Sequence, residues 1–255
     1  MQDPLIHGYC ANSEQDLQLL RKVERETYQN ADQMLFLTQQ AMLATEKRLS
    51  LRGKGKVIYP GANQAAIHKE KTGSTYVPQF TLAHFGSLGG VRNLGAFIEG
   101  VRLAIPERLG MVDHISINLY GDIGKDDLHR IMAFTHPTLF SIKGRVTRGV
   151  ALDAMTQSEI LLLIQGKHPI SAETIPSKLY EYLHVGRPVL ALVHENSEIK
   201  QMIEPLAHTC VSMDPDEIAQ ALITLYDQWL NGALAESHPS PYSVKNAVTA
   251  IVKLM

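Results

Sequence analysis

Apolar strands and amphipathic helices alternate along the chain from residue 79 to residue 230. The segments that predict strands are residues 79–85, 114–121, 139–146, 159–166, 188–193 and 209–213. An amphipathic segment that predicts a helix follows each of them: residues 91–106, 125–134, 148–157, a stretch that ends before Gly186, 197–205 and 214–230. Strands that are apolar on both faces are typical of parallel sheets. The sequence therefore predicts an α/β fold with a doubly wound, Rossmann-like parallel sheet.

The first 50 residues have a different pattern. They predict a helix over 16–31, a short strand over 34–38 and a helix over 39–49 that Thr38 caps. One strand with two helices cannot bury its own faces, so this segment needs a partner surface. A basic, glycine-containing linker follows at 49–56, and residues 56–63 predict a further strand that ends in a turn. We expect a division into residues 1–50 and residues 51–255.

Charge and cysteine content exclude several classes of protein. The formal net charge is -2, which does not favour the broad basic face of a nucleic-acid-binding protein. Cys10 and Cys210 lie far apart, so neither a disulfide framework nor a structural zinc site is expected. The histidines are scattered, no Asp-x-Asp metal signature occupies a plausible loop, and no apolar run approaches about 18 residues. We expect a cytoplasmic protein without a transmembrane segment or a metal.

In a doubly wound sheet, ligands bind outside the carboxyl ends of the strands, so the loops after the strands are the candidate site. The loop after the strand at 79–85 contains Gly86, Ser87, Gly89 and Gly90, followed by Arg92. Glycines allow backbone amides to approach a diphosphate, and Arg92 adds a charged donor. The same glycines are also compatible with an ordinary tight turn between a strand and a helix.

A second candidate loop follows the strand at 139–146. Residues Val146 to Gly149 are placed to offer backbone groups to the flat edge of a nucleotide base. Arg145 either anchors this site or is simply solvated, and the sequence leaves both interpretations open.

The third candidate is the stretch ETIPSKLYEYLHVGRPVLAL, residues 173–192, in which seven residues separate Glu173 from Glu181. If Glu173 lies in the loop and Glu181 lies two turns into the helix, they are up to roughly 12 Å apart. That span suits an elongated ligand with its phosphates at the helix N-terminus. Alternatively, Lys178 and Glu181 form a plain surface ion pair.

From about residue 56 onward, the chain resembles the C-terminal, nucleotide-sugar-binding domain of GT-B glycosyltransferases, specifically the retaining group called family 4. The resemblance lies in FGSLGGVRN, in FSIKGRV and above all in E-x7-E within ETIPSKLYEYLHVGRPVLAL. It implies the donor-binding half of a retaining, metal-independent glycosyltransferase. Such an enzyme moves a sugar, for example a hexosyl group, from a nucleoside diphosphate sugar to an acceptor, in polysaccharide or glycan biosynthesis.

The resemblance also implies roles for single residues. Glu181 would accept hydrogen bonds from the ribose hydroxyls, and Glu173, the catalytic candidate, would lie beside the donor sugar. Val146 would lie against the base.

The diphosphate would be held by the remaining candidates. Arg92 and Lys178 would supply positive charge, and Ile175 and Ser177 would offer backbone amides. Ser87 departs from the pattern, because many relatives have an arginine at that place.

The same resemblance gives a meaning to residues 1–50. QNADQMLFLT resembles the last strand-helix unit of the acceptor domain, so this segment is expected to be a remnant of the N-terminal acceptor domain plus a crossing segment. Most of that domain is absent. We therefore expect that the chain alone is inactive, that the acceptor domain is supplied in cis or in trans, and that any peripheral membrane association goes through the absent half.

Two other functions fit the same architecture, since fold does not fix function. The first is a nucleotide-sugar epimerase, which would need catalytic carboxylates and a histidine in a complete cleft. The second is a non-catalytic module that binds a nucleotide or docks a partner.

Overall fold

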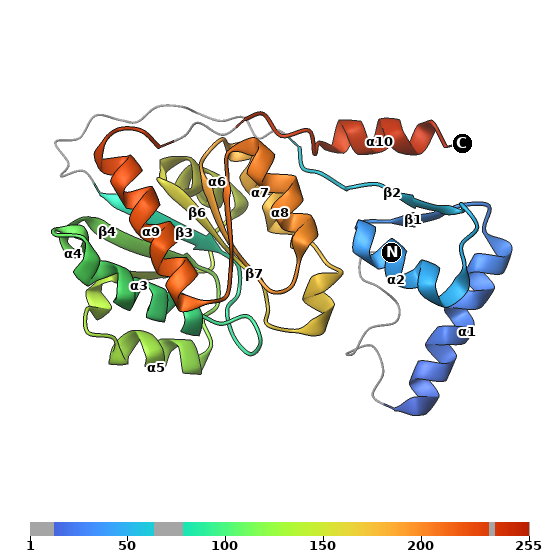
Figure 1. Cartoon of the computed structure of the whole chain (residues 1–255), viewed down its shortest axis with the longest axis horizontal. Helices are drawn as coiled ribbons and strands as arrows, with labels where there is room; N and C mark the ends of the chain where they lie inside the picture. Colours follow the sequence, from blue (N-terminus) through green and yellow to red (C-terminus); the bar gives the residue numbers. More distant parts are fainter. Residues whose placement is uncertain (1–12, 64–78, 235–237, 255) are drawn as a thin grey trace.

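The computed structural model describes residues 13–63, 79–234 and 238–254 (Figure 1). Cys10 and the first part of the predicted N-terminal segment lie outside the described residues. The described chain forms a large α/β lobe and a smaller first lobe, and the C-terminus lies on the same side of the molecule as the first lobe.

A six-stranded sheet, parallel throughout, forms the centre of the large lobe. Its spatial order is β5-β4-β3-β6-β7-β8. The strands are β3 (Phe80–Phe85), β4 (Ile115–Tyr120), β5 (Phe140–Gly144), β6 (Ile160–Ile164), β7 (Val189–Val193) and β8 (Thr209–Ser212). The order confirms the predicted doubly wound parallel sheet, because it grows outward in both directions from β3 and β6.

Helices cover both faces of this sheet. One face packs against α3 (Gly95–Glu107), α5 (Lys125–Ala133) and α9 (Pro215–Leu230). The other face packs against α6 (Arg148–Gln157), α7 (Ser177–Val185) and α8 (Ser197–Ile203). On β3, Leu82 faces the first group of helices and Ala83 faces the second, as the alternation of side chains along a strand requires. Both faces are buried, which explains why the strands are continuous apolar runs in the sequence.

Some boundaries differ from the sequence expectation. The helix predicted from residue 91 begins only at Gly95, because Gly89 and Arg92 exchange two backbone hydrogen bonds and close a turn first. The short helix α4 (Met111–His114) and the helix α10 (Val244–Val252) have no counterpart in the prediction. Three 3-10 turns lie at η1 (Pro137–Leu139), η2 (Pro169–Ala172) and η3 (Glu204–Leu206).

The first lobe consists of α1 (Glu14–Asn30), β1 (Met34–Phe36), α2 (Gln39–Leu49) and β2 (Gly55–Val57). The Thr38 side chain caps α2, as predicted, by accepting from the Ala41 backbone N–H at 3.2 Å. The strand expected over 56–63 forms at 55–57 and pairs in parallel with β1, not with the large sheet. Residues 55–57 thus associate with the first lobe although they follow residue 50.

A buried carboxylate contributes to the junction between the two lobes. Glu198, in the first turn of α8, accepts from the backbone N–H groups of Gln39 at 2.6 Å and Gln40 at 3.1 Å, which open α2. It also accepts from the Tyr59 hydroxyl at 2.7 Å. A carboxylate at a helix N-terminus is stabilised by the unpaired amides and the helix dipole. The contact holds the first lobe against the large lobe.

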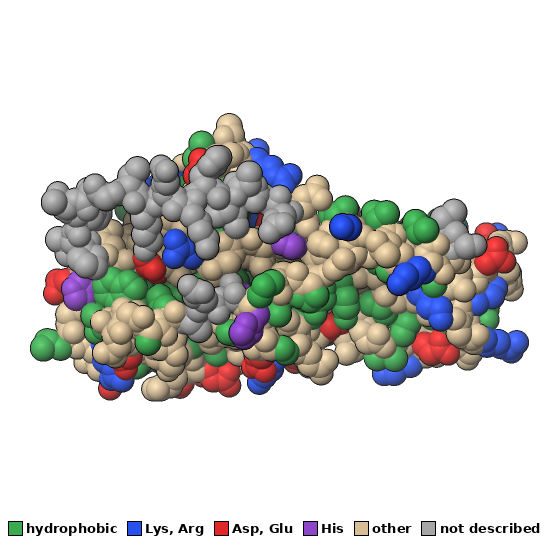
Figure 2. All heavy atoms as spheres, turned by 90° about the horizontal axis from the view of Figure 1, so that it is seen from above, with side chains coloured by type: hydrophobic (Ala, Val, Ile, Leu, Met, Phe, Trp, Pro, Cys, Tyr) green, Lys and Arg blue, Asp and Glu red, His purple; other side chains and the backbone are tan. Residues whose placement is uncertain are grey.

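The face of the molecule seen in Figure 2 has no large patch of purely acidic or purely basic side chains. Acidic and basic side chains occur over both lobes in Figure 2, in keeping with the near-neutral net charge. Among the described helices, none combines the length and the apolar character that crossing a lipid bilayer requires.

Candidate functional site

The candidate site lies at the carboxyl ends of β3 and β6. These two strands pair in the middle of the sheet, and the chain leaves them toward opposite faces. Such a switch in strand order opens a crevice between the two following loops. The loops are tied together by the backbone N–H of Lys167, which donates to the carbonyl of Val91 at 2.8 Å.

The glycine loop after β3 packs directly on the loop after β4. Gly86 N–H donates to the Tyr120 carbonyl at 2.8 Å, and a β-carbon on Gly121 would lie 2.4 Å from the Gly86 carbonyl oxygen. Gly90 has a φ of 58° with no atom near its missing side chain, so backbone conformation, rather than space, requires glycine there. Ser87 lies exposed on this loop.

A cavity of about 470 Å³ opens between the glycine loop, the loop after β6 and the first lobe. Three predicted site residues line it: Arg92, Ile175 and Ser177. The other lining residues are Leu37, Thr38, Pro60, Val91, Gln165, Gly166, His168, Ile170, Ser171, Thr174, Pro176 and Tyr180. Arg92 is exposed, and its guanidinium has no hydrogen-bond or ion-pair partner within residues 13–63, 79–234 and 238–254.

Two buried amides hold the loop after β6 in place. The Gln165 side-chain NH2 donates to the carbonyls of Ser171 at 2.7 Å and Thr174 at 3.0 Å. The Asn196 NH2 donates to the same two carbonyls at 2.6 and 2.8 Å. Sequence reasoning missed both residues. The signal for Gln165 was a polar amide directly after an apolar strand, and the signal for Asn196 was an amide directly ahead of a helix. Their burial with complete hydrogen bonding makes the loop a fixed wall of the cavity.

Helix α7 points its N-terminus toward this cavity. Its N-cap is Pro176, which makes no side-chain capping hydrogen bond, so the first backbone N–H groups of the helix are not occupied by a cap. As predicted, Leu179, Tyr182 and Leu183 are buried against the sheet. The Tyr182 hydroxyl accepts from the Phe85 backbone N–H at 2.9 Å, which fixes α7 to the end of β3.

Glu181 lies further along α7, outside the lining of the cavity. Its carboxylate contacts Lys178 Nζ at 2.6 Å and Arg148 Nη2, from the start of α6, at 3.3 Å. The glutamate side chain is only 23% exposed, whereas those of Lys178 and Arg148 are 41% and 71% exposed. The pair between Lys178 and Glu181 is therefore present, and Arg148 extends it to a second helix.

Arg145 and Val146 follow β5 and are both exposed. Arg145 forms a two-pronged ion pair with Asp122 of the loop after β4. Hydrogen bonding from Arg145 lowers the pKa of the Asp122 carboxyl. In this arrangement Arg145 joins the loops after β4 and β5, and Val146 lies beside it at the same edge of the sheet.

Glu173 is oriented differently from the other candidates. Its backbone carbonyl accepts from the Thr38 hydroxyl at 2.6 Å, and it is not among the residues that line the cavity. Burial raises the pKa of its carboxyl, and Arg48 and Glu24 of the first lobe are the charges that act on it. One carboxylate oxygen, Oε2, is buried without a partner in the described part of the chain. The structure thus places this side chain toward the first lobe and does not bring it together with Arg92 and Ser177.

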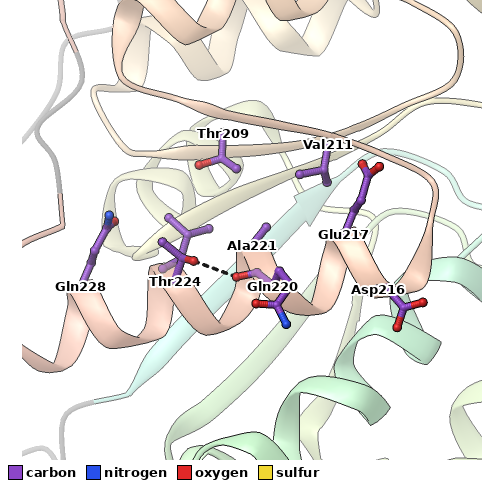
Figure 3. A pocket seen from close by; sticks show the side chains of 9 residues that line it. Thr209, Val211, Asp216, Glu217, Gln220, Ala221, Thr224 and Gln228 are labelled. Carbon is purple, nitrogen blue, oxygen red and sulfur yellow. Dashed lines mark hydrogen bonds between the residues drawn. The ribbon is translucent and has the colours of Figure 1, made fainter.

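A second cavity, of about 490 Å³, lies between β8 and α9 (Figure 3). In Figure 3, Thr209 and Val211 of the edge strand face Gln220 and Thr224 of the helix. The Glu217 carboxylate already accepts a hydrogen bond from the backbone N–H of Ser212 at the end of β8. The groove lies at the edge strand β8, which β7 separates from β6 in the sheet. Nowhere in the described ranges do three or more His, Cys, Asp or Glu side chains form a group that could hold a metal.

No family model matches the sequence, and no curated protein matches it. Solved structures do match the fold. Anabaena Alr3699/HepE, in complex with UDP and glucose, is 14% identical to the chain at a TM-score of 0.74, over 99% of this chain and 69% of HepE. A mutant of S. aureus TarM, in complex with Fondaparinux, alpha-GlcNAc-glycerol and UDP, is 12% identical to the chain at a TM-score of 0.66. The match covers 97% of this chain and 48% of TarM. WaaG, a glycosyltransferase involved in lipopolysaccharide biosynthesis, is 12% identical to the chain at a TM-score of 0.63. The match covers 88% of this chain and 61% of WaaG.

The chain has the GT-B glycosyltransferase fold. This confirms the architecture that FGSLGGVRN, FSIKGRV and the E-x7-E stretch indicate. At these identities the likeness establishes the fold, and the chain spans about half to two thirds of the length of the matched proteins. Membership of family 4 and a retaining outcome remain predictions.

A buried histidine at the base of the site predicts a pH dependence of stability. His84 Nδ1 lies 3.0 Å from the Leu162 carbonyl, which can only accept, so Nδ1 carries the proton, while Nε2 is buried without a partner in the described residues. Burial lowers the pKa of His84 to about 4 from 6.5. Because the unfolded chain binds a proton as the pH falls through 6.5 and the folded chain does not until about 4, stability is lost on acidification.

We expect His84 to account for about 2 kcal/mol of lost stability between pH 7 and pH 5. Urea unfolding of the wild type and of His84→Leu at both pH values tests this. The pH-dependent loss should be smaller by that amount in the variant, whatever its absolute stability. His208, whose pKa burial also lowers to about 4, keeps its own contribution in both proteins. An identical pH-dependent loss in the two proteins would contradict the assignment.

Proposed function

We propose that this chain is the donor-binding part of a retaining, metal-independent glycosyltransferase. It would take a nucleoside diphosphate sugar, and the complete enzyme would pass the sugar to an acceptor in polysaccharide or glycan biosynthesis. One observation carries the proposal: an arginine without a partner among the described residues and an uncapped helix N-terminus face one cavity at the switch point of a doubly wound sheet. The solved structures of HepE and TarM, which share the fold, contain UDP.

The diphosphate fits between the glycine loop and α7. Arg92 supplies a full positive charge, and the start of α7, at Ile175 and Ser177, supplies backbone N–H groups and the positive end of the helix dipole. These groups would stabilise the charge that develops on the leaving diphosphate, a task that a metal ion performs in other enzymes. Lys178, at the second position of α7, pairs with Glu181 in the structure and would have to leave that carboxylate to reach the phosphates.

The ribose and base would extend along α7 toward the end of β5. Glu181 is already oriented by Lys178 and Arg148, and a carboxylate held in this way can accept from two neighbouring hydroxyls. Val146, exposed at the end of β5, would lie against the base, with Arg145 fixed beside it by Asp122.

Glu173 is the proposed contact to the donor sugar. Its carboxyl faces the first lobe in the structure, so this role requires the side chain to turn toward the cavity when the donor binds. Burial raises the pKa of this carboxyl, and no partner for its Oε2 lies among the described residues, so these residues do not fully satisfy the carboxylate.

The acceptor side is proposed to belong to a second domain, in the same polypeptide or in another chain. Within the described residues, the first lobe has a parallel sheet of two strands, β1 and β2, and parallel sheets are normally larger and covered on both faces. Leu35 of β1 is 36% exposed, in keeping with a face that further strands or helices complete.

Two alternatives use the same fold: an epimerase that acts on the sugar nucleotide, and a module that only binds it. A labelled sugar nucleotide distinguishes them when the acceptor domain is supplied, because the products differ. Transfer gives a new glycoside, epimerisation gives an altered nucleotide sugar, and a binding module returns the donor unchanged.

Replacement of Arg92 tests the diphosphate site. Arg92→Gln removes a charge-assisted contact and should weaken the binding of bare UDP or GDP by about 10-fold to 100-fold, as measured by calorimetry. The matched control is Arg102→Gln, which removes an exposed arginine of α3 that pairs with Glu99 outside the cavity. Equal affinities for the wild type and both variants would refute the site.

Replacements of Glu181 and Glu173 should affect the affinities for two ligands, the bare nucleoside diphosphate and the intact sugar nucleotide, in different ways. Glu181→Gln should weaken bare nucleoside diphosphate by roughly 10-fold to 150-fold, because charge-assisted bonds to the ribose are lost. Glu173→Gln should leave the bare diphosphate almost unaffected and weaken only the intact sugar nucleotide. Calorimetry with both ligands, after circular dichroism has established folding, measures this. Unchanged affinity of folded Glu181→Gln for both ligands would remove the ribose assignment.

A further inference from the structure

Tyr180 lines the cavity at the switch point, although only 3% of the residue is exposed. Its hydroxyl has no hydrogen-bond partner within residues 13–63, 79–234 and 238–254. The hydroxyl is not sealed inside the protein either, because the buried and unpartnered side-chain atoms of the described ranges belong to His84, Asp127, Glu173 and His208. A tyrosine that is buried usually has a partner for its hydroxyl. The partner of the Tyr180 hydroxyl must therefore come from the cavity.

Packed aromatic rings hold Tyr180 in this position. Its ring meets the edge of the Tyr242 ring, with the centroids 6.2 Å apart and the planes at 70°. Tyr242 meets Tyr59 in the same manner, at 5.3 Å and 81°. The Tyr59 hydroxyl donates at 2.7 Å to Glu198, the carboxylate at the junction of the two lobes. A side chain that is already fixed loses little conformational entropy when a ligand binds to it.

The place of Tyr180 on α7 indicates which part of a donor it would meet. Ser177 begins α7, and Tyr180 follows it by three residues, a rise of about 4.5 Å. Residues with this spacing are neighbours on a helix surface, and both line the cavity. Glu181, the proposed ribose contact, lies outside the cavity lining and pairs with Arg148. In a nucleoside diphosphate sugar, the diphosphate separates the ribose from the sugar. With the phosphates at the start of α7 and the ribose at Glu181, the sugar enters the cavity beside Tyr180.

We propose that the Tyr180 hydroxyl contacts the donor sugar through a hydrogen bond with one of its hydroxyl groups. The inference rests on the proposed function, which places the diphosphate at the start of α7. Unlike Glu173, Tyr180 already lines the cavity, so the contact requires no rearrangement of its side chain. Burial, together with Glu198 and Tyr59, raises the pKa of the phenol. The hydroxyl thus stays protonated and can both donate and accept.

Tyr180→Phe tests the contact, because it keeps the ring and removes only the hydroxyl. The measured quantity is the dissociation constant of a sugar nucleotide divided by that of the bare diphosphate with the same base. Calorimetry compares UDP-glucose, UDP-galactose and UDP-N-acetylglucosamine with UDP, and GDP-mannose with GDP. For at least one sugar nucleotide, the ratio should rise by about 3-fold to 10-fold in Tyr180→Phe, as expected for the loss of one hydrogen bond. A general loss of stability would weaken both ligands and leave the ratio unchanged.

Tyr226→Phe is the matched control. Tyr226 is also buried in the large lobe, but its hydroxyl contacts His114 Nδ1 at 2.7 Å on the other face of the sheet. This variant loses a hydroxyl and should leave the ratio unchanged. If folded Tyr180→Phe keeps the wild-type ratio for every sugar nucleotide, or if both variants change it equally, the inference is overturned.

The wild-type ring provides a second measurement that does not depend on the stability of a variant. In a chain with carbon-13 in its tyrosine rings, the NMR signal of Tyr180 is the one absent from Tyr180→Phe. At saturation, a sugar nucleotide should shift this signal further than the bare diphosphate does. Equal shifts with the bare diphosphate and with every sugar nucleotide would contradict the contact.

Bare UDP and GDP separate the two levels of the argument. If neither binds, the proposed function fails and the inference fails with it. If one binds in a manner that depends on Arg92 but Tyr180→Phe leaves every ratio unchanged, the inference alone is wrong.

Discussion

The pairing of β3 with β6 at the centre of the sheet is the constraint on which the site depends. The chain leaves the two strands toward opposite faces, so their following loops cannot pack on each other along their whole length. The crevice that results holds Arg92 from one loop and the start of α7 from the other. The same topology explains why residues far apart in sequence contribute to one cavity.

The shape of the cavity is then fixed by a few buried polar groups. Gln165 and Asn196 hold the loop after β6 by the same two carbonyls, and Glu198 holds the first lobe by the N-terminus of α2. Buried polar groups of this kind stabilise a structure only when every partner is in place. Because these groups are satisfied within the protein, they are not available to a ligand.

Much of the fold could be predicted from the sequence, because local patterns determine it. The cap at Thr38 and the buried face of α7, with Leu179 and Tyr182, follow from helix periodicity and capping preferences. The pairing of β2 with β1 and the roles of Gln165 and Asn196 could not be predicted, because they depend on contacts between distant segments. The E-x7-E spacing likewise says nothing about the position of Glu173 relative to the first lobe, where the Thr38 hydroxyl donates to its backbone carbonyl.

The central claim is that a nucleoside diphosphate binds between the glycine loop and the start of α7. Backbone amide NMR of the isotope-labelled chain, titrated with UDP and with GDP, tests it directly. The account predicts saturable shifts that concentrate at residues 86–92 and 175–178, with smaller changes at β8 and α9. Shifts confined to the groove between β8 and α9, or no shifts with either nucleotide at millimolar concentration, would contradict it.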